Sequence, residues 1–210
     1  QDLPLVLDHL QKVNPSAPLH VIAHSWGGVL LNSFLARFPH RVEQVQSMIY
    51  FGSKRNINTF SLKKAWVIDF LWDFIGGILS KKKGYLPAKA LRFGSDDEPL
   101  RYYLDVVKWA KPKSPWVDTH DGFDYAQAIQ KIELPSTLYL AGASDVYLGN
   151  PRDVIDFMKE SGEKNACYRL LSKAKGNLHN YGHIDMLTHP DAVKDHFPLV
   201  LEWLHQHSKK

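Results

Sequence analysis

The sequence has 210 residues, of which 44% are hydrophobic and 23% charged, the balance of a globular chain that can bury a core. Its net charge of +4 lies on scattered basic residues without a nucleic-acid-binding motif, which argues against nucleic acid as a partner. The single cysteine, Cys167, excludes an internal disulfide and favours a reducing compartment such as the cytoplasm, but the compartment stays open because the chain starts inside a helical pattern.

The first quarter of the chain predicts helix, strand, helix and strand in that order. A helix starts near Asp2, and residues 19–23 form a short buried strand. Residues 29–35 have helical spacing, and residues 42–51 are a second strand. Strand, helix and strand make a βαβ unit, so the sheet should be parallel. One face of the first helix should be apolar, formed by Leu3, Val6, Leu7, Leu10 and Val13.

The pattern changes in residues 54–131, which we interpret as a helical lid inserted into the sheet domain. Residues 65–79 are rich in Trp, Phe, Ile and Leu but are too short and too charged to span a bilayer. Residues 100–110 predict an amphipathic helix. The alternative is a set of ordinary helices that cover the sheet.

The strand and helix alternation resumes in residues 132–210, so the core should comprise residues 1–53 and 132–210. Strands are expected at 136–141 and 166–171, with a helix after Asn150-Pro151. A last helix should run from about 190 to 205. Its inner side should be formed by Val193, Phe197, Val200, Leu201 and Leu204.

Ser25 lies between a predicted strand and a predicted helix, in the run Ala23-His24-Ser25-Trp26-Gly27-Gly28. A sharp turn there lifts the serine hydroxyl above the sheet, and the small neighbours Ala23 and Gly27 let the two arms approach. The helix start also places the Trp26 N–H beside any oxyanion that forms on a substrate.

A nucleophilic serine needs a base, and the base needs an orienting group. Asp145 and His183 follow the ends of later strands, and parallel sheets collect their sites at those ends. The turn at Ser25 and the chain order Ser, Asp, His resemble the α/β-hydrolases. The resemblance implies Ser25 as nucleophile, Asp145 as acid, His183 as base and Trp26 as an oxyanion donor.

The second half resembles one branch of these hydrolases, the acid lipases of the gastric and lysosomal type. The shared segments are Leu134-Pro135, residues 142–145, Asn150-Pro151-Arg152-Asp153-Val154 and His183-Ile184-Asp185. Asp185 and Asp153 are the rivals of Asp145 for the role of acid.

Two groups of side chains invite a metal interpretation: Asp118, His120, Asp121 and Asp124, and then His179, His183, Asp185 and His189. Neither has the spacing of a known zinc or calcium motif, so solvated loops are the better account. We expect no metal and no cofactor.

Three aromatic residues of the lid, Trp66, Phe70 and Trp72, would form an apolar entrance above the serine, and His24 would line the substrate pocket. The lysine triplet 81–83 could then meet anionic lipid headgroups in a transient membrane contact. The alternative is that the aromatic residues pack the lid internally.

These features predict a serine hydrolase that cleaves a small-molecule or lipid ester with an apolar acyl group through an acyl-enzyme. An acyltransferase or a serine peptidase could use the same residues. A third possibility, from another class, is a hydrolase fold that only binds a partner.

The resemblance also implies several strands before the serine turn, and a loop there that supplies a second oxyanion donor. Only 18 residues precede residue 19, and they suffice for one helix. We therefore expect a preceding hydrolase segment that is absent from this chain, and the strand 19–23 at an edge of the sheet.

Overall fold

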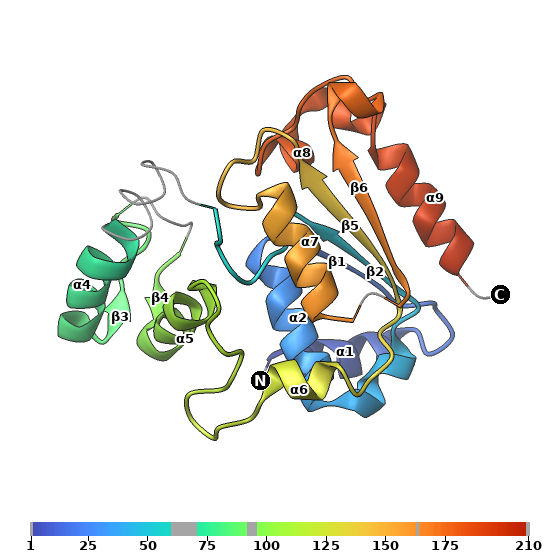
Figure 1. The fold of residues 1–210 in the computed structure, drawn as a ribbon. Coiled ribbons are helices and arrows are strands. Elements are labelled where there is room, and N and C mark those ends of the chain that lie inside the picture. Colours follow the sequence, from blue (N-terminus) through green and yellow to red (C-terminus); the bar gives the residue numbers. More distant parts are fainter. Residues whose placement is uncertain (1, 60–70, 92–95, 163, 209–210) are drawn as a thin grey trace. The chain divides into compact units, whose positions relative to one another are not determined.

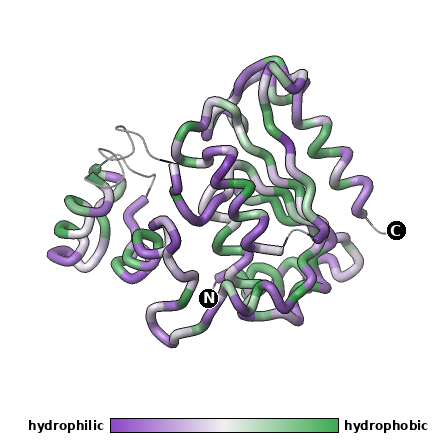
Figure 2. Tube along the Cα trace, viewed as in Figure 1, coloured by the Kyte–Doolittle hydropathy of each residue, from purple (hydrophilic) through white to green (hydrophobic). Residues whose placement is uncertain are grey.

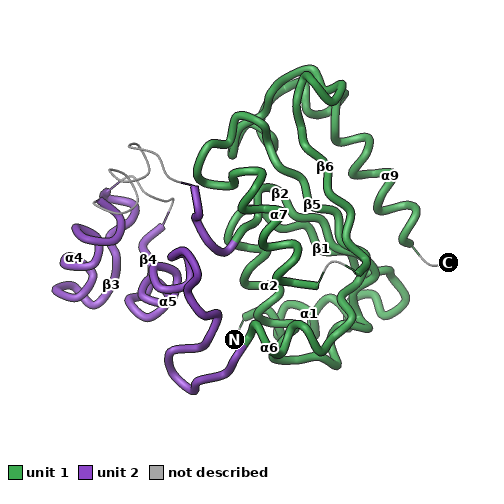
Figure 3. Tube along the Cα trace, viewed as in Figure 1, with its two compact units in different colours: residues 1–54, 125–210 green, residues 55–124 purple. Residues whose placement is uncertain are grey.

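The computed structural model describes residues 2–59, 71–91, 96–162 and 164–208. It divides into two compact units, residues 1–54 with 125–210 and residues 55–124 (Figure 3). The second unit ends at Asp124, whereas the sequence division placed the end of the lid at residue 131.

Four parallel strands form the sheet of the first unit, in the order β1-β2-β5-β6 (Figure 1). The strands are β1 (His20–His24), β2 (Ser47–Phe51), β5 (Ser136–Gly142) and β6 (Ala166–Leu171). The predicted parallel α/β class is therefore confirmed. The predicted start of the second strand at residue 42 is wrong, because Pro39–Gln44 forms a 3₁₀ helix, η1. Pro39 lies in its first turn, where a fixed φ favours a helical start.

The strand before Ser25, β1, lies at an edge of this sheet, as expected. Ile22 in β1 is 53% exposed. The preceding helix, α1 (Asp2–Val13), buries Leu7 alone. The other four residues of the predicted apolar face are exposed: Leu3, Val6, Leu10 and Val13.

Helices cover both faces of the sheet. On one face, Tyr50 lies under α2 (Trp26–Arg37) and donates a 2.6 Å hydrogen bond to Asn32 Oδ1. Tyr139 on the same face packs edge-on against Phe157 of α7 (Pro151–Glu160). α6 (Tyr125–Ile129) adjoins α2, since the Arg37 guanidinium donates to the Tyr125 hydroxyl.

The opposite face packs against α9 (Phe197–His207), and hydrophobic residues recur along the strands (Figure 2). Each large aliphatic side chain buried here contributes about 1.5–3 kcal/mol of transfer free energy. The buried cluster on this face includes Ile49, Phe51, Leu138, Leu140 and Val200.

The predicted helix over 190–205 is two helices, η4 (Pro190–Val193) and α9, and the prediction of one continuous helix is wrong. Pro198 in the first turn of α9 starts a new helix, because proline has no N–H for the preceding turn. Val193 and Leu201, expected inside, are exposed. Two further short helices in this half are η3 (Lys173–Lys175) and α8 (Asp185–Thr188).

The second unit contains α4 (Gly76–Lys83), a small antiparallel pair of β3 (Tyr85–Leu86) with β4 (Glu98–Pro99), and α5 (Leu100–Ala110). The helix predicted at 100–110 is confirmed. The Tyr103 side chain is fully buried beside Leu86 and Ala88, and Trp72 packs against this cluster. None of the helices in the described ranges is long and apolar enough to cross a membrane.

His196, between η4 and α9, is 1% exposed, and its Nε2–H donates to the Met186 carbonyl at 2.7 Å. Burial lowers the pKa of His196, and the pKa values of His20 and His24 move the same way for the same reason. The unfolded chain therefore binds protons more readily than the folded one.

We expect the free energy of unfolding to have its maximum value above about pH 6.5, the pKa of an unfolded histidine, and to fall as the pH decreases below it. His196→Gln keeps an N–H donor and cannot titrate, so its urea-unfolding free energy should vary less between pH 7.5 and 5. His9→Gln, on the exposed side of α1, is the control. An His196→Gln protein with the full acid sensitivity would contradict this assignment.

Candidate active site

Ser25 occupies the sharp turn between β1 and α2 that the sequence predicts. Its φ of 54° and ψ of −124° lie where a residue with a side chain is strained. The Ser25 N–H donates to the Phe51 carbonyl at 2.8 Å, which ties the turn to the end of β2. The neighbouring strand thus holds the serine backbone in a conformation that the residue alone would avoid.

Gly27 and Gly28, which follow Ser25, differ in the space that each has for a side chain. A Cβ added to Gly27 would meet the Ala23 Cβ at 3.5 Å, an ordinary contact. A Cβ on Gly28 would lie 2.5 Å from Ser53 Oγ and 2.7 Å from Ser53 Cβ, closer than real atoms approach. Sequence analysis placed the tight approach at Gly27, and the structure places the tighter one at Gly28.

We expect Gly28→Ala to destabilise the protein by about 1–3 kcal/mol, the usual range for overpacking a buried contact. Gly27→Ala is the matched control and should be neutral or stabilising, since alanine favours a helix over glycine. Urea unfolding of both proteins measures the difference. Equal stabilities for the two variants would contradict the contact with Ser53.

His183 and Asp145 form a buried pair at the carboxyl ends of the strands. His183 Nδ1–H donates to Asp145 Oδ2 at 2.6 Å, and the two side chains are 9% and 3% exposed. The Leu148 N–H donates to the other carboxylate oxygen at 3.1 Å. Asp145 thereby fixes the proton on Nδ1 and leaves Nε2 of His183 able to accept one.

The other two candidate acids have different partners. Asp185 Oδ1 accepts the N–H of Gly182, in the loop that carries His183. Asp153 is buried in the first turn of α7. Of the three aspartates, Asp145 is therefore the one paired with His183.

Two glycines that sequence analysis did not single out make room for this pair. A Cβ on Gly149 would lie 2.6 Å from Asp145 Oδ2 and 2.7 Å from the Gly52 carbonyl oxygen. Gly52 has a φ of +57°, and a Cβ there would lie 3.1 Å from His183 Nδ1. The sequence feature that could have identified them is their position, because Gly52 follows the end of β2 and Gly149 precedes α7.

His24 contacts His183 from the end of β1. Its Nε2–H donates to the His183 carbonyl at 3.0 Å, and the two rings lie 4.5 Å apart. Burial, and then the neighbouring His183, lower the pKa of His24, so its ring favours the neutral form. The contact makes His24 a positioning residue for His183, and its place in a substrate pocket stays a prediction.

The remaining predicted site residues are distributed over both units. Trp26 is the first residue of α2, so its backbone N–H lies at the positive end of the helix. Trp72 packs its ring against Tyr103 inside the second unit, 5.4 Å between centroids, and Tyr103 donates to the Trp72 carbonyl. Trp66 and Phe70 lie outside the described residues.

The acidic loop of the second unit satisfies its carboxylates locally. Asp118 Oδ1 accepts the His120 N–H at 2.8 Å and lies 3.4 Å from the Arg101 guanidinium. Asp121 Oδ1 accepts the Phe123 N–H at 3.0 Å. These bonds are typical of loop turns.

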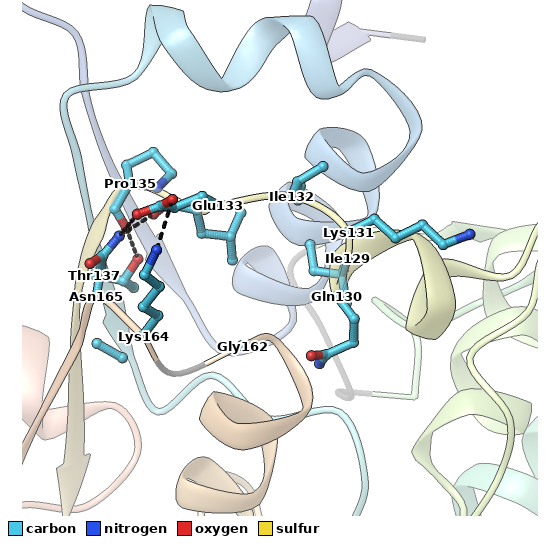
Figure 4. A pocket seen from close by; sticks show the side chains of 12 residues that line it. Ile129, Gln130, Lys131, Ile132, Glu133, Pro135, Thr137, Gly162, Lys164 and Asn165 are labelled. Carbon is cyan, nitrogen blue, oxygen red and sulfur yellow. Dashed lines mark hydrogen bonds and ion pairs between the residues drawn. The ribbon is translucent and has the colours of Figure 1, made fainter.

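A pocket of about 440 Å³ lies at the amino ends of β5 and β6 (Figure 4). Its lining includes Thr137 and Ala166, which are at the amino ends of β5 and β6, and an ion pair of Lys164 with Glu133 at 3.1 Å. Sites in parallel sheets form at the carboxyl ends, where Asp145 and His183 lie. This pocket is therefore remote from the candidate catalytic residues.

No protein-family model matches the chain, and no curated protein sequence matches it. The chain does match solved structures in its fold. A monoacylglycerol lipase from Paleococcus ferrophilus is 13% identical with a TM-score of 0.55, over 98% of this chain and 73% of that chain. The α/β hydrolase GrgF from Penicillium sp. sh18 is 12% identical with a TM-score of 0.54, over 99% and 70%. BpoC from Mycobacterium tuberculosis H37Rv is 15% identical with a TM-score of 0.52, over 99% and 73%.

At these identities the similarity establishes the fold. The chain has the α/β-hydrolase fold that the Ser25 turn and the order of Ser25, Asp145 and His183 predicted. The likeness to the acid-lipase branch is not tested by these structures.

Proposed function

We propose that the protein is a serine hydrolase of carboxylic esters. The observation that carries the proposal is the buried His183–Asp145 pair, at the same edge of the sheet as the strained turn of Ser25. Ser25 Oγ attacks the ester carbonyl carbon while His183 Nε2 takes its proton, and Asp145 stabilises the resulting imidazolium.

His183 then gives the proton to the departing alcohol, which leaves Ser25 acylated. Water, deprotonated by His183, attacks the acyl carbon. The bond to Ser25 Oγ breaks, His183 returns the proton to Oγ, and the acid is released. The Trp26 N–H at the start of α2 stabilises the oxyanion that forms in both steps. His24 holds the backbone of His183 throughout through its bond to that carbonyl.

Two further observations support an ester as the substrate. One structural neighbour of the same fold is a monoacylglycerol lipase. The segments shared with the acid lipases include both Asp145 and His183, so we propose that branch as the nearest in mechanism. An acyltransferase or peptidase would use the same residues with another substrate.

Fluorophosphonate labelling tests the proposal, because such reagents react with activated serines. We expect the protein to be labelled, and Ser25→Ala to lose both labelling and turnover of p-nitrophenyl esters. Labelling that persists in Ser25→Ala would place the nucleophile elsewhere. A protein that is never labelled would be a hydrolase fold used for binding, and thioester or peptide turnover without ester turnover would favour the acyltransferase or peptidase.

Matched aspartate variants separate the acid from its rivals. Asp145→Asn favours the wrong tautomer of His183, a change that costs about 10⁴ in turnover in a known triad. Asp185→Asn and Asp153→Asn are the controls and should lose much less. If Asp185→Asn is the slowest of the three, Asp145 is not the acid.

We further propose that the second unit selects apolar acyl groups. Phe74 and Ile78 are 57% and 44% exposed and four residues apart, at and just before α4. The exposed lysines 81–83 follow at the end of the same helix. An apolar surface beside a basic one suits an acyl chain and an anionic lipid surface.

A series of p-nitrophenyl esters tests this selection. Each methylene buried is worth about 0.8 kcal/mol, so kcat/KM should rise about four-fold per methylene until the binding surface is filled. Phe74→Ala should flatten the rise and reduce co-sedimentation with phosphatidylserine vesicles. Leu201→Ala, equally exposed on α9, is the control. A preference for acetate that Phe74→Ala leaves unchanged would refute the proposal.

A further inference from the structure

Three side chains of the first unit converge away from Ser25, Asp145 and His183. They are His179, His189 and Asp191, and we refer to them as the His–His–Asp cluster. One possible ligand atom from each lies within 4.8 Å of the others. The side chains are 36%, 32% and 29% exposed, so an ion could reach them from solvent. Imidazole nitrogens with a carboxylate oxygen are typical ligands of divalent transition metals.

The cluster joins two segments that are already fixed by other bonds. Tyr181 is fully buried, and the edge of its ring packs against both histidines at 5.7 Å and 5.9 Å between centroids. The Tyr181 hydroxyl donates to Asp195 Oδ2 at 2.7 Å. Asp195 also accepts the Leu178 N–H at 2.9 Å. The ligand side chains are thus mounted on a rigid frame, which lowers the conformational cost of binding.

Two hydrogen bonds lie within the cluster, and they differ in kind. His189 Nδ1 accepts the Asp191 N–H at 3.1 Å, so a metal at that nitrogen would take the place of this bond. His179 Nε2–H donates to Asp191 Oδ2 at 2.7 Å, and the two imidazole rings lie 4.2 Å apart. Around a tetrahedral zinc with bonds of about 2.0–2.2 Å, ligand atoms lie roughly 3.4 Å apart. Since the ligand atoms lie up to 4.8 Å apart, exchange of the shared proton for a metal ion requires changes in their separations of up to about 1.4 Å.

One cation already neighbours the cluster. Lys194 Nζ lies 2.8 Å from Asp191 Oδ1, the carboxylate oxygen that does not accept from His179. This leaves Oδ2 for the metal, as a single ligand. The Lys194 side chain is 70% exposed, so it can turn to solvent when a second cation binds. Lys194 should weaken metal binding without blocking it.

We propose that His179, His189 and Asp191 bind one divalent transition-metal ion, for which zinc is the best-matched probe. Three protein ligands leave a coordination position for water. The bound ion links the loop that leads to His183 with η4, and so stabilises the carrier of the proposed catalytic base. The proposal departs from the sequence-based expectation of a solvated loop, because Asp191 was not among the residues considered there. It does not depend on the proposed function.

Calorimetric titration of ZnCl₂ into the chelator-treated, dialysed chain tests this site. We expect one zinc per chain and a melting temperature that rises with zinc concentration, because an ion that binds the folded state stabilises it. His179→Gln and Asp191→Asn should each weaken zinc binding at least ten-fold. Lys194→Gln should strengthen it, since the competing charge is gone. His205→Gln, exposed on α9, should leave it unchanged.

Two results would overturn the proposal. The first is a chain that binds no zinc at about 10⁻⁴ M. This concentration is deliberately generous, because above it weak surface sites fill as well. The second is zinc binding that His179→Gln and Asp191→Asn leave unchanged. Zinc lost only in His183→Gln would place the ion on the His183–Asp145 pair instead. Each readout is a binding measurement, so failure of the metal site and failure of the proposed ester hydrolysis are distinguishable.

Discussion

The register of the parallel sheet is the constraint on which the site depends. His24 of β1 lies opposite Phe51 of β2, and Phe51 lies opposite Leu140 of β5. β1 and β2 therefore end at the same level, β5 and β6 continue to Gly142 and Leu171, and the chain leaves all four strands at the same edge. Ser25 follows β1, Asp145 follows β5 and His183 follows β6. A slip of one residue between strands would turn their side chains to the other face and separate these groups.

At this edge of the sheet, backbone segments approach other side chains so closely that glycine is needed. Gly28, Gly52 and Gly149 lie where an added Cβ would meet Ser53, His183 and Asp145 at 2.5–3.1 Å. Only a residue without a side chain allows the loops after β2 and β5 to pack against the His183–Asp145 pair. The pair is then largely shielded from solvent, where a charge-assisted hydrogen bond is stronger than in water.

The sequence predicted what local pattern controls. The parallel strands, the turn at Ser25 and the cap at Asn150, whose side chain accepts from the Arg152 N–H, follow from hydrophobic periodicity and turn chemistry. The misjudged features depend on tertiary contacts. The break before α9 and the exposure of Val193 and Leu201 show this, because periodicity gives which residues share a face and not what covers it. The crowding at Gly28 and Gly149 is likewise between segments distant in sequence.

Two hydrogen-bonded His–Asp pairs among the described residues have similar geometry, and their surroundings give them different chemistry. His183–Asp145 and His179–Asp191 have nearly equal hydrogen bonds, 2.6 Å and 2.7 Å. The first pair is 9% and 3% exposed, and its carboxylate also accepts the Leu148 N–H. The second is about one third exposed and has His189 beside it. Burial and a fixed tautomer suit proton transfer, whereas access and a third ligand suit a metal, so two histidines four positions apart can serve separate purposes.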